Sequence, residues 1–211
     1  MLDPLAEVVL LLRPAPGFSK LVLGAGVWSA YRSDAPGPFY CAVIEGKCRL
    51  ALEGGQAHVL EAGDFVLAPA MLAVTLSSAQ ASTGQAHTVP TQADDGSFRI
   101  GAQDGPADVR IVIGHCSFGS PDAALLVSLL PRLVHVRGEL RLTTLVNLVG
   151  EEARTNRPAR AVVLARLLEV LLIEALRSLT ASDTTPGLVR ALSDARLAAA
   201  LRAMHGAPAH A

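Results

Sequence analysis

A run of short apolar segments separated by turn residues is the feature of this sequence that most constrains its fold. Between Phe39 and Pro69 the segments are Phe39–Ile44, Cys48–Leu52, His58–Leu60 and Phe65–Leu67. The turn residues between and after them are Gly46, Gly54-Gly55, Gly63-Asp64 and Pro69. Closed all-β domains have short strands at this spacing, with a turn signal between each pair. We therefore predict a small antiparallel β-barrel in this region.

The pattern extends on both sides of this region. Apolar side chains at helical spacing after Asp3 and Pro4 predict a short amino-terminal helix that ends near Leu12. Further strands are expected from Lys20 to Tyr31, onward to about Leu76, and over residues 108–118. Residues 78–107 are rich in Ser, Thr, Gln, Gly, Asp and Pro, so we expect them to form a long mobile loop.

From Ser120 onward the periodicity is helical. We predict helices over residues 120–131, 142–153, 159–179 and 188–204. The third carries an apolar stripe formed by Val163, Leu164, Leu167, Leu168, Leu171, Leu172, Ala175 and Leu176. A stripe of this width needs two partners. We expect the barrel to cover one side and a second copy of the chain to cover the rest, as a homodimer; a wholly internal stripe is the alternative.

These elements predict an α+β fold, in which an antiparallel β-barrel precedes an α-helical dimerisation segment. The expected division is a barrel with an amino-terminal helix over residues 1–118, a helical segment over 119–182, and a linker helix over 183–211.

Composition excludes several classes of partner. The chain has 18 basic and 19 acidic residues, a net charge of −1, and so no long-range field to attract nucleic acid or an anionic membrane. Apolar runs such as Val170–Ile173 are far too short to span a membrane. No secretory signal is recognisable, and three cysteines do not suggest a disulfide framework. A cytoplasmic location is expected.

A barrel of this type resembles the cupins. Placing Gly46 at the glycine of the first cupin motif puts Phe39 where metal-dependent cupins carry a glutamate. The two histidine positions of that motif then fall near Arg32, in a stretch without histidine. Gly63 and Pro69 match the second motif, but Val74 stands at its histidine position. Without these ligands, we expect none of the standard metal-dependent chemistry of cupins.

A narrower resemblance extends over nearly the whole chain. The segments that carry it are Asp3–Leu5, Cys41–Cys48, Gly63–Pro69, Gly114–Phe118, Leu130–Val136, Arg157-Pro158 and Leu164–Arg177. In order and spacing, they are similar to the amino-terminal regulatory domain of AraC-type transcription regulators. That resemblance implies a non-enzymatic domain that senses a small-molecule effector and dimerises. The segment Asp194–His205 resembles the helix that leads into a helix-turn-helix domain, and the chain ends where that domain would begin. DNA binding is therefore expected only through a carboxy-terminal domain that is not in this chain.

Four residues near the expected barrel mouth are candidates for effector contact, because ligand pockets combine an apolar lining with a few polar groups. They are Trp28, Tyr31, Arg32 and Tyr40. Simple packing of the aromatic rings and solvation of the guanidinium are the alternatives. His58 and His87 are expected to face solvent, and Gly63-Asp64 is expected to be a turn rather than a site.

A zinc or redox site is a second hypothesis. Strand alternation would place Cys41 and Cys48 inside the barrel, where His115 or Cys116 from the last strand could join them. The alternative is that these cysteines are small buried hydrophobic residues. If they held a metal ion, the chain could be an atypical small cupin metalloenzyme, which is the rival to the regulatory function.

Overall fold

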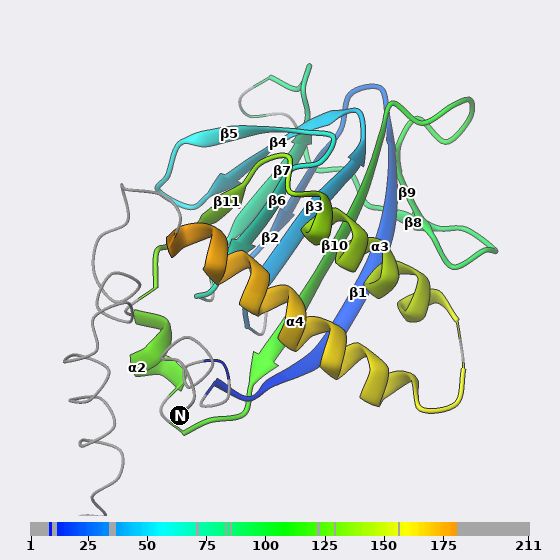
Figure 1. Cartoon of the computed structure of the whole chain (residues 1–211). Coiled ribbons are helices and arrows are strands. Elements are labelled where there is room, and N and C mark those ends of the chain that lie inside the picture. Colours follow the sequence, from blue (N-terminus) through cyan, green and yellow to red (C-terminus); the bar gives the residue numbers. More distant parts are fainter. Residues whose placement is uncertain are drawn as a thin grey trace, which may run out of the picture.

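The strands of this chain form two β-sheets (Figure 1). The structure, a computed structural model, describes residues 9, 12–33, 37–70, 72–82, 84, 86–121, 123–128, 130–155 and 157–180. Seven strands form one sheet in the order β11-β6-β3-β10-β1-β9-β8, and four form the other in the order β2-β7-β4-β5. All neighbouring strands are antiparallel except β1 and β9.

The strands are numbered in the order in which they occur along the chain. The first six strands are β1 (Pro14–Ala25), β2 (Ser29–Arg32), β3 (Phe39–Glu45), β4 (Lys47–Leu52), β5 (Ala57–Glu61) and β6 (Phe65–Ala68). The remaining strands are β7 (Val74–Ser78), β8 (Thr91–Gln92), β9 (Phe98–Gly101), β10 (Val109–Phe118) and β11 (Val134–Val136). The described helices are α2 (Ala123–Ser128), α3 (Leu140–Arg154) and α4 (Arg160–Thr180).

The predicted closed barrel is not formed by the described residues. Their two sheets share no strand pairing, and they pack face to face as an open sandwich. Gly46 and Gly63 carry the chain from one sheet to the other, whereas Gly54-Gly55 closes a hairpin within the four-stranded sheet. The turn residues were thus correctly located. Their spacing could not show which turns stay within a sheet and which cross between sheets.

Gly46 illustrates why such a crossing needs glycine. Its φ is +74°, a backbone conformation that L-residues with a side chain rarely adopt. A Cβ added there would collide with the carbonyl oxygen of Asp108. The close approach of β3 and β10 at this corner therefore depends on a missing side chain.

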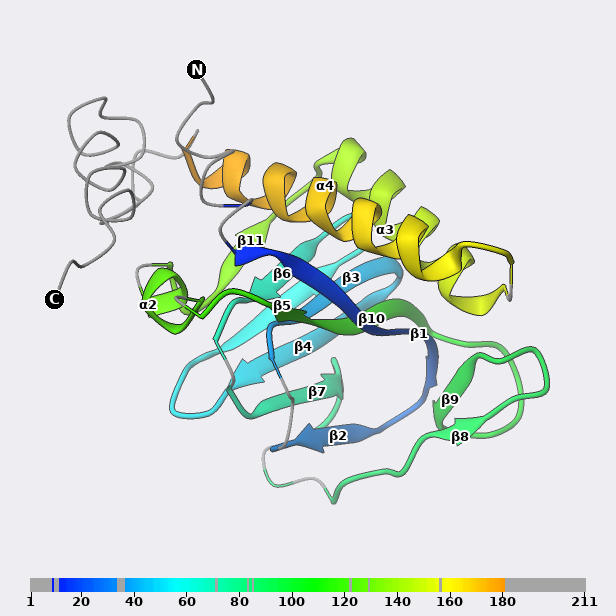
Figure 2. The same cartoon turned by 90° about the horizontal axis from the view of Figure 1, so that it is seen from below.

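The two long helices cover one face of the seven-stranded sheet, and the four-stranded sheet lies on its other face (Figure 2). Side chains alternate accordingly along β3: Tyr40 and Ala42 face the helices, while Phe39, Cys41 and Val43 face the other sheet. Strand β10 alternates in the same way.

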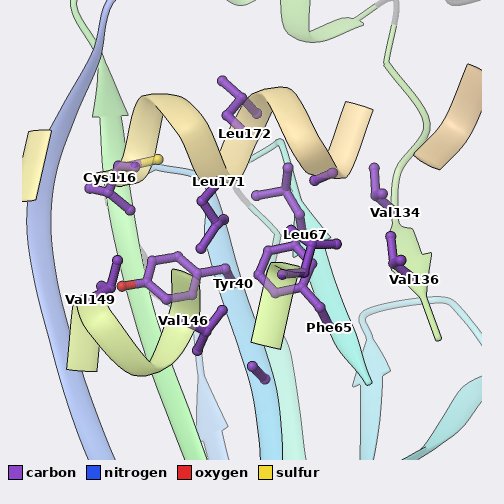
Figure 3. Packing of buried hydrophobic residues seen from close by; sticks show 14 of the residues in the cluster. Tyr40, Phe65, Leu67, Cys116, Val134, Val136, Val146, Val149, Leu171 and Leu172 are labelled. Carbon is purple, nitrogen blue, oxygen red and sulfur yellow. The ribbon is translucent and has the colours of Figure 1, made fainter. Parts of the chain in front are cut away.

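Two buried clusters result from this alternation. The helix-side core includes Leu21, Tyr40, Phe65, Leu67, Val112, Cys116, Val134, Val146, Val149, Leu168, Leu171 and Leu172 (Figure 3). The inter-sheet core includes Val22, Trp28, Phe39, Cys41, Val43, Cys48, Leu50, Leu60, Val66, Leu76, Ile100 and Ile111. The seven-stranded sheet is the wall between them.

The predicted helices over 142–153 and 159–179 are confirmed as α3 and α4. Most of the stripe on α4 is buried under the sheet and α3, namely Leu164, Leu168, Leu171, Leu172, Ala175 and Leu176. Val163, at the edge of the stripe, is 40% exposed. No described helix is long and apolar enough to cross a membrane.

Residues 78–107 differ from the expectation of a loop without packing. They contain β8 and β9, and β9 extends the seven-stranded sheet by pairing with β1. Ile100 is buried in the inter-sheet core and Phe98 packs against it. Two apolar residues among many polar ones gave too weak a pattern to predict a strand. Strand β11, which pairs with β6, was likewise not predicted.

Two predicted helices fall mainly outside the described residues. At the amino terminus, only Val9 and Leu12 of the expected helix are described, and both are buried in the helix-side core. The predicted helix over residues 188–204 lies wholly outside the described part.

Candidate functional site

A cavity of about 420 Å³ opens between the two sheets at one end of the sandwich. Strands β1, β2, β3, β7, β9 and β10 all contribute to it, together with a segment that precedes β8. Its lining residues are Phe18, Lys20, Val22, Ala30, Tyr31, Arg32, Phe39, Val74, Leu76, His87, Thr88, Val89, Pro90, Phe98 and Ile113. We refer to it as the inter-sheet pocket. Its volume and mainly apolar lining are typical of small-molecule sites.

Two cationic side chains lie at this pocket. The Lys20 Nζ lies 4.1 Å from the ring centroid of Phe98 and 4.9 Å from that of Phe18. The guanidinium carbon of Arg32 lies 4.7 Å from the same Phe18 ring. Burial, and then the charge of Arg32, lower the pKa of Lys20. The two cations therefore lie close enough to repel one another.

His115 lies beside these cations on β10. Its ring packs edge-on against Phe18, with 4.0 Å between ring centroids. Burial, followed by the charges of Arg32 and Lys20, lowers the pKa of His115 below its ordinary value. The imidazole is therefore mainly neutral at pH 7.

A short segment closes one side of the pocket by binding to β2. The Thr88 amide donates a hydrogen bond to the Ser29 carbonyl at 2.6 Å. The His87 ring stacks on Tyr31 with centroids 5.3 Å apart, and its Nδ1 lies 3.4 Å from the Ser29 hydroxyl. His87 is exposed, as predicted, and it nevertheless forms part of the pocket rim.

The structure brings together two of the four candidate ligand residues. Tyr31 and Arg32 line the inter-sheet pocket. Trp28 lies at the other end of the sandwich, where it is 1% exposed and lines a second cavity of about 520 Å³. Trp28 follows the end of β1, whereas the pocket is lined by Phe18, Lys20 and Val22 from the middle of that strand.

Tyr40 lies on the other side of the seven-stranded sheet from the pocket. Its ring packs between β3 and α3, near Val146 and Val149 (Figure 3). Burial raises the pKa of its phenol to about 12. Alternation along β3 separates it from Phe39, which does line the pocket.

The four candidate metal ligands are not brought together. Cys41 and Cys48 are buried in the inter-sheet core, while Cys116 lies in the helix-side core and His115 at the pocket. His115 and Cys116 are adjacent on one strand, so their side chains point to opposite faces. Within the described part of the chain, no group of three His, Cys, Asp or Glu side chains could hold a metal ion.

The thiols of Cys41 and Cys116 also lie in surroundings that keep them protonated. A hydrogen bond with Cys48, followed by burial, raises the pKa of Cys41 well above its ordinary value. Burial raises the pKa of Cys116 to about 12. Because the thiolate is the metal-binding form, these environments favour the interpretation as small buried hydrophobic residues.

Sequence reasoning missed Phe18, Lys20 and Phe98 as pocket residues. Lys20 carried the available signal, because it is a lone charge next to the apolar run Leu21–Leu23. In an alternating strand it had to share a face with Phe18 and Val22, and that face lines the pocket. No comparable signal marked Phe98, which lies in the segment expected to be a loop.

Comparisons with known proteins agree with this architecture. A family model described as "Cupin" matches residues 3–181. A protein of Streptomyces lividans described as an AraC-like transcription regulator is 30% identical over 217 residues, covering 99% of this chain and 70% of the relative. A protein of Streptomyces antibioticus with the same description is 31% identical over 218 residues, covering 99% and 71%.

Two solved structures show weaker similarity. ToxT from Vibrio cholerae, solved with an unsaturated fatty acid bound, is 10% identical with a TM-score of 0.40, over 78% of this chain and 52% of that chain. YhaK from Escherichia coli is 6% identical with a TM-score of 0.34, over 60% and 46%. This chain therefore aligns with only about half of each of these two proteins. The family match and the two Streptomyces relatives show that the chain belongs to the cupin family and, within it, to the AraC-like transcription regulators.

Proposed function

We propose that this chain is the effector-sensing and dimerisation domain of an AraC-like transcription regulator, with the inter-sheet pocket as its effector site. One observation carries the proposal: the two positions that resemble vacated metal-ligand positions of cupins, Phe39 and Val74, both line this pocket. The place that holds a metal ion in metal-dependent cupins is here an apolar cavity with a few polar groups. Such a cavity suits a small organic ligand.

The chemical groups of the pocket lining also favour a non-enzymatic role. The pocket lining combines apolar residues with cations and a histidine, and no Asp or Glu is among its described residues. The rival interpretation as an atypical metalloenzyme needed Cys41 and Cys48 to be joined by His115 or Cys116. The first two lie together in the inter-sheet core, but His115 packs against Phe18 and Cys116 lies in the helix-side core.

The proposed homodimer interface follows the outer seam between α3 and α4. On α3, Arg141, Leu145 and Leu148 share one side at helical spacing. On α4, Val163, Leu167, Val170 and Glu174 share one side in the same way. The Arg141 guanidinium and the Glu174 carboxylate pair at 3.1 Å, which places these two sides next to each other.

Apolar side chains remain exposed along that seam. Leu148, Val163 and Val170 are 44%, 40% and 40% exposed. We propose a second copy of this chain as the partner that covers them, because the resemblance to AraC-type regulators implies dimerisation through these helices. The other proposed partners are the small-molecule effector and DNA. DNA would be bound only through a carboxy-terminal domain, and the regulator would act in the cytoplasm.

The test is genetic. Deleting the gene should change the abundance of a defined set of transcripts, and restoring the wild-type gene should reverse that change. The variant Ile113→Trp places a large side chain in the pocket. In the deletion strain it should restore the amount of the protein, but not the change in transcript abundance with growth conditions. An unchanged transcript profile in the deletion strain would overturn the regulatory function. A normal response with the Ile113→Trp protein would show that the pocket is not the sensor.

A further inference from the structure

We propose that the inter-sheet pocket selects a carboxylate with an apolar body, and that Lys20 and Arg32 bind its charged end. This inference rests on the proposed function and specifies the class of effector.

The two cations come from opposite walls of the pocket. Lys20 belongs to β1 in the seven-stranded sheet, and Arg32 to β2 in the four-stranded sheet. Both lie against the ring of Phe18, with Lys20 Nζ at 4.9 Å and the Arg32 guanidinium carbon at 4.7 Å from its centroid. Two positive groups from separate sheets therefore line the same pocket and share one ring as a neighbour, near enough for the charge of Arg32 to lower the pKa of Lys20.

The described lining of the pocket contains cations and no carboxylate. Among the described residues, no carboxylate lies within ion-pairing distance of the Lys20 ammonium, and none lines the pocket. The lowered pKa of Lys20 reflects burial and the nearby Arg32. An anion bound in the pocket near both cations would reduce their mutual repulsion, and a planar guanidinium suits a carboxylate in particular.

The rest of the lining suits an apolar ligand body. Val22, Phe39, Val74, Leu76, Phe98 and Ile113 come from both sheets and present only hydrocarbon surface. Apart from the two cations, the polar side chains of the described lining are Tyr31, His87 and Thr88, on β2 and the neighbouring segment. A neutral polyol would need hydrogen-bonding partners on several sides, because desolvated hydroxyl groups without partners oppose binding. The distribution of polar and apolar side chains in the pocket therefore favours a ligand with one charged end and one apolar end.

The experiment uses three probes with the same body. Binding of 4-phenylbutyrate, 4-phenylbutanamide and 4-phenylbutylamine to the whole chain is measured by titration calorimetry. We expect the carboxylate to bind about tenfold or more tightly than the amide, and the amine most weakly, because ionic hydrogen bonds exceed neutral ones by this order. The variants Lys20→Met and Arg32→Gln should each reduce that preference to within roughly threefold. The matched control is Lys47→Met, an exposed lysine at the second cavity, and it should leave the preference unchanged.

Two pocket-filling variants, Ile113→Trp and Ala30→Phe, locate the binding. Each variant is first checked for a cooperative thermal unfolding transition. If only one of the two folds, the binding measurement uses that variant. Carboxylate binding that persists in a folded, filled variant lies elsewhere and would overturn the inference. Equal binding of amide and carboxylate would overturn the ligand class while leaving a ligand-binding pocket, as the proposed function requires. If none of the three probes bound, both the ligand class and the pocket as effector site would be contradicted.

Discussion

The Tyr40 ring lies directly against the Cα of Gly114 on the neighbouring strand. The two residues are register partners between β3 and β10, and both positions face the helices. A Cβ added to Gly114 would collide with the Cζ and hydroxyl oxygen of Tyr40 and with the Phe18 carbonyl. Glycine inside a strand usually weakens it, and here it provides the space that a large buried ring needs.

Replacing Gly114 with alanine should therefore destabilise the fold. We expect Gly114→Ala to reduce the free energy of unfolding by about 1–3 kcal/mol, the usual effect of overpacking a filled core. Urea denaturation measures it. Gly119→Ala is the control, since a Cβ there would lie 3.6 Å from the nearest atom, the Arg13 carbonyl oxygen, which is an ordinary contact. Equal effects of the two substitutions would contradict the assigned role of Gly114.

Asp64 connects the turn before β6 to β11. Its buried carboxylate accepts a hydrogen bond from the Glu61 amide at 3.1 Å and lies 3.1 Å from His135 Nε2. Asp64→Ala should lower the free energy of unfolding by about 1–3 kcal/mol, because buried partners lose their hydrogen bonds. The comparison variant is Asp104→Ala, an exposed aspartate. If both variants unfold at the same urea concentration, the Asp64 carboxylate does not stabilise this corner.

His115 should make folding stability depend on pH. Burial and the charges of Arg32 and Lys20 hold its pKa in the folded chain below the value of about 6.5 in the unfolded chain. In the window below pH ~6.5 the unfolded state therefore binds more protons, so this contribution makes stability fall as the pH falls. Above that value the contribution does not vary.

The measurement is urea denaturation across a series of pH values. His115→Gln should remove part of the loss of stability on acidification. His58→Gln, which replaces an exposed histidine on β5, is the matched comparison variant. A pH profile that His115→Gln leaves unchanged would show that protonation of His115 is not opposed in the folded state.

The seam between α3 and α4 gives a closely matched test of the proposed dimer. Val163 lies on the seam, whereas Val162, its neighbour on α4, is 61% exposed on another side of the helix. We expect Val163→Glu to weaken self-association by at least about tenfold, because a charge would be buried against apolar side chains. Val162→Glu should have little effect. Sedimentation equilibrium measures both, and a monomeric wild-type chain at high concentration would refute the dimer.

The order of the strands along the chain could be predicted largely because local signals determine it. Glycines, Pro69 and short β-branched runs mark the ends of β3 to β6, and i, i+3, i+4 spacing marks α3 and α4. The arrangement of those strands in two sheets could not be predicted, since Gly46 and Gly54 look alike in sequence. One carries the chain between sheets, and the other closes a hairpin.

The candidate site was predictable only in part, for a similar reason. Arg32 and Tyr31 lie at the end of β2. Their position in the sequence was therefore enough to predict that they lie at the pocket. Trp28 is only three residues before Tyr31, but it lies at the other end of β2, beside the second cavity. Tyr40 could not be assigned to a face without the register that pairs it with Gly114. Phe98 became a site residue only through pairing between β1 and β9, which sets it opposite Val22.

The alternation along β10 has a mechanical consequence. Ile113 lines the pocket and His115 packs beside it, while Val112 and Cys116 support the helices from the opposite face of the same strand. A ligand that displaces this strand by a fraction of an ångström displaces the surface on which α3 and α4 rest, because packed interiors transmit strain. Signal transfer from the pocket to the helix seam would then need no loop movement and no hinge. The seven-stranded sheet, which is packed on both faces, would itself connect the pocket to the helices.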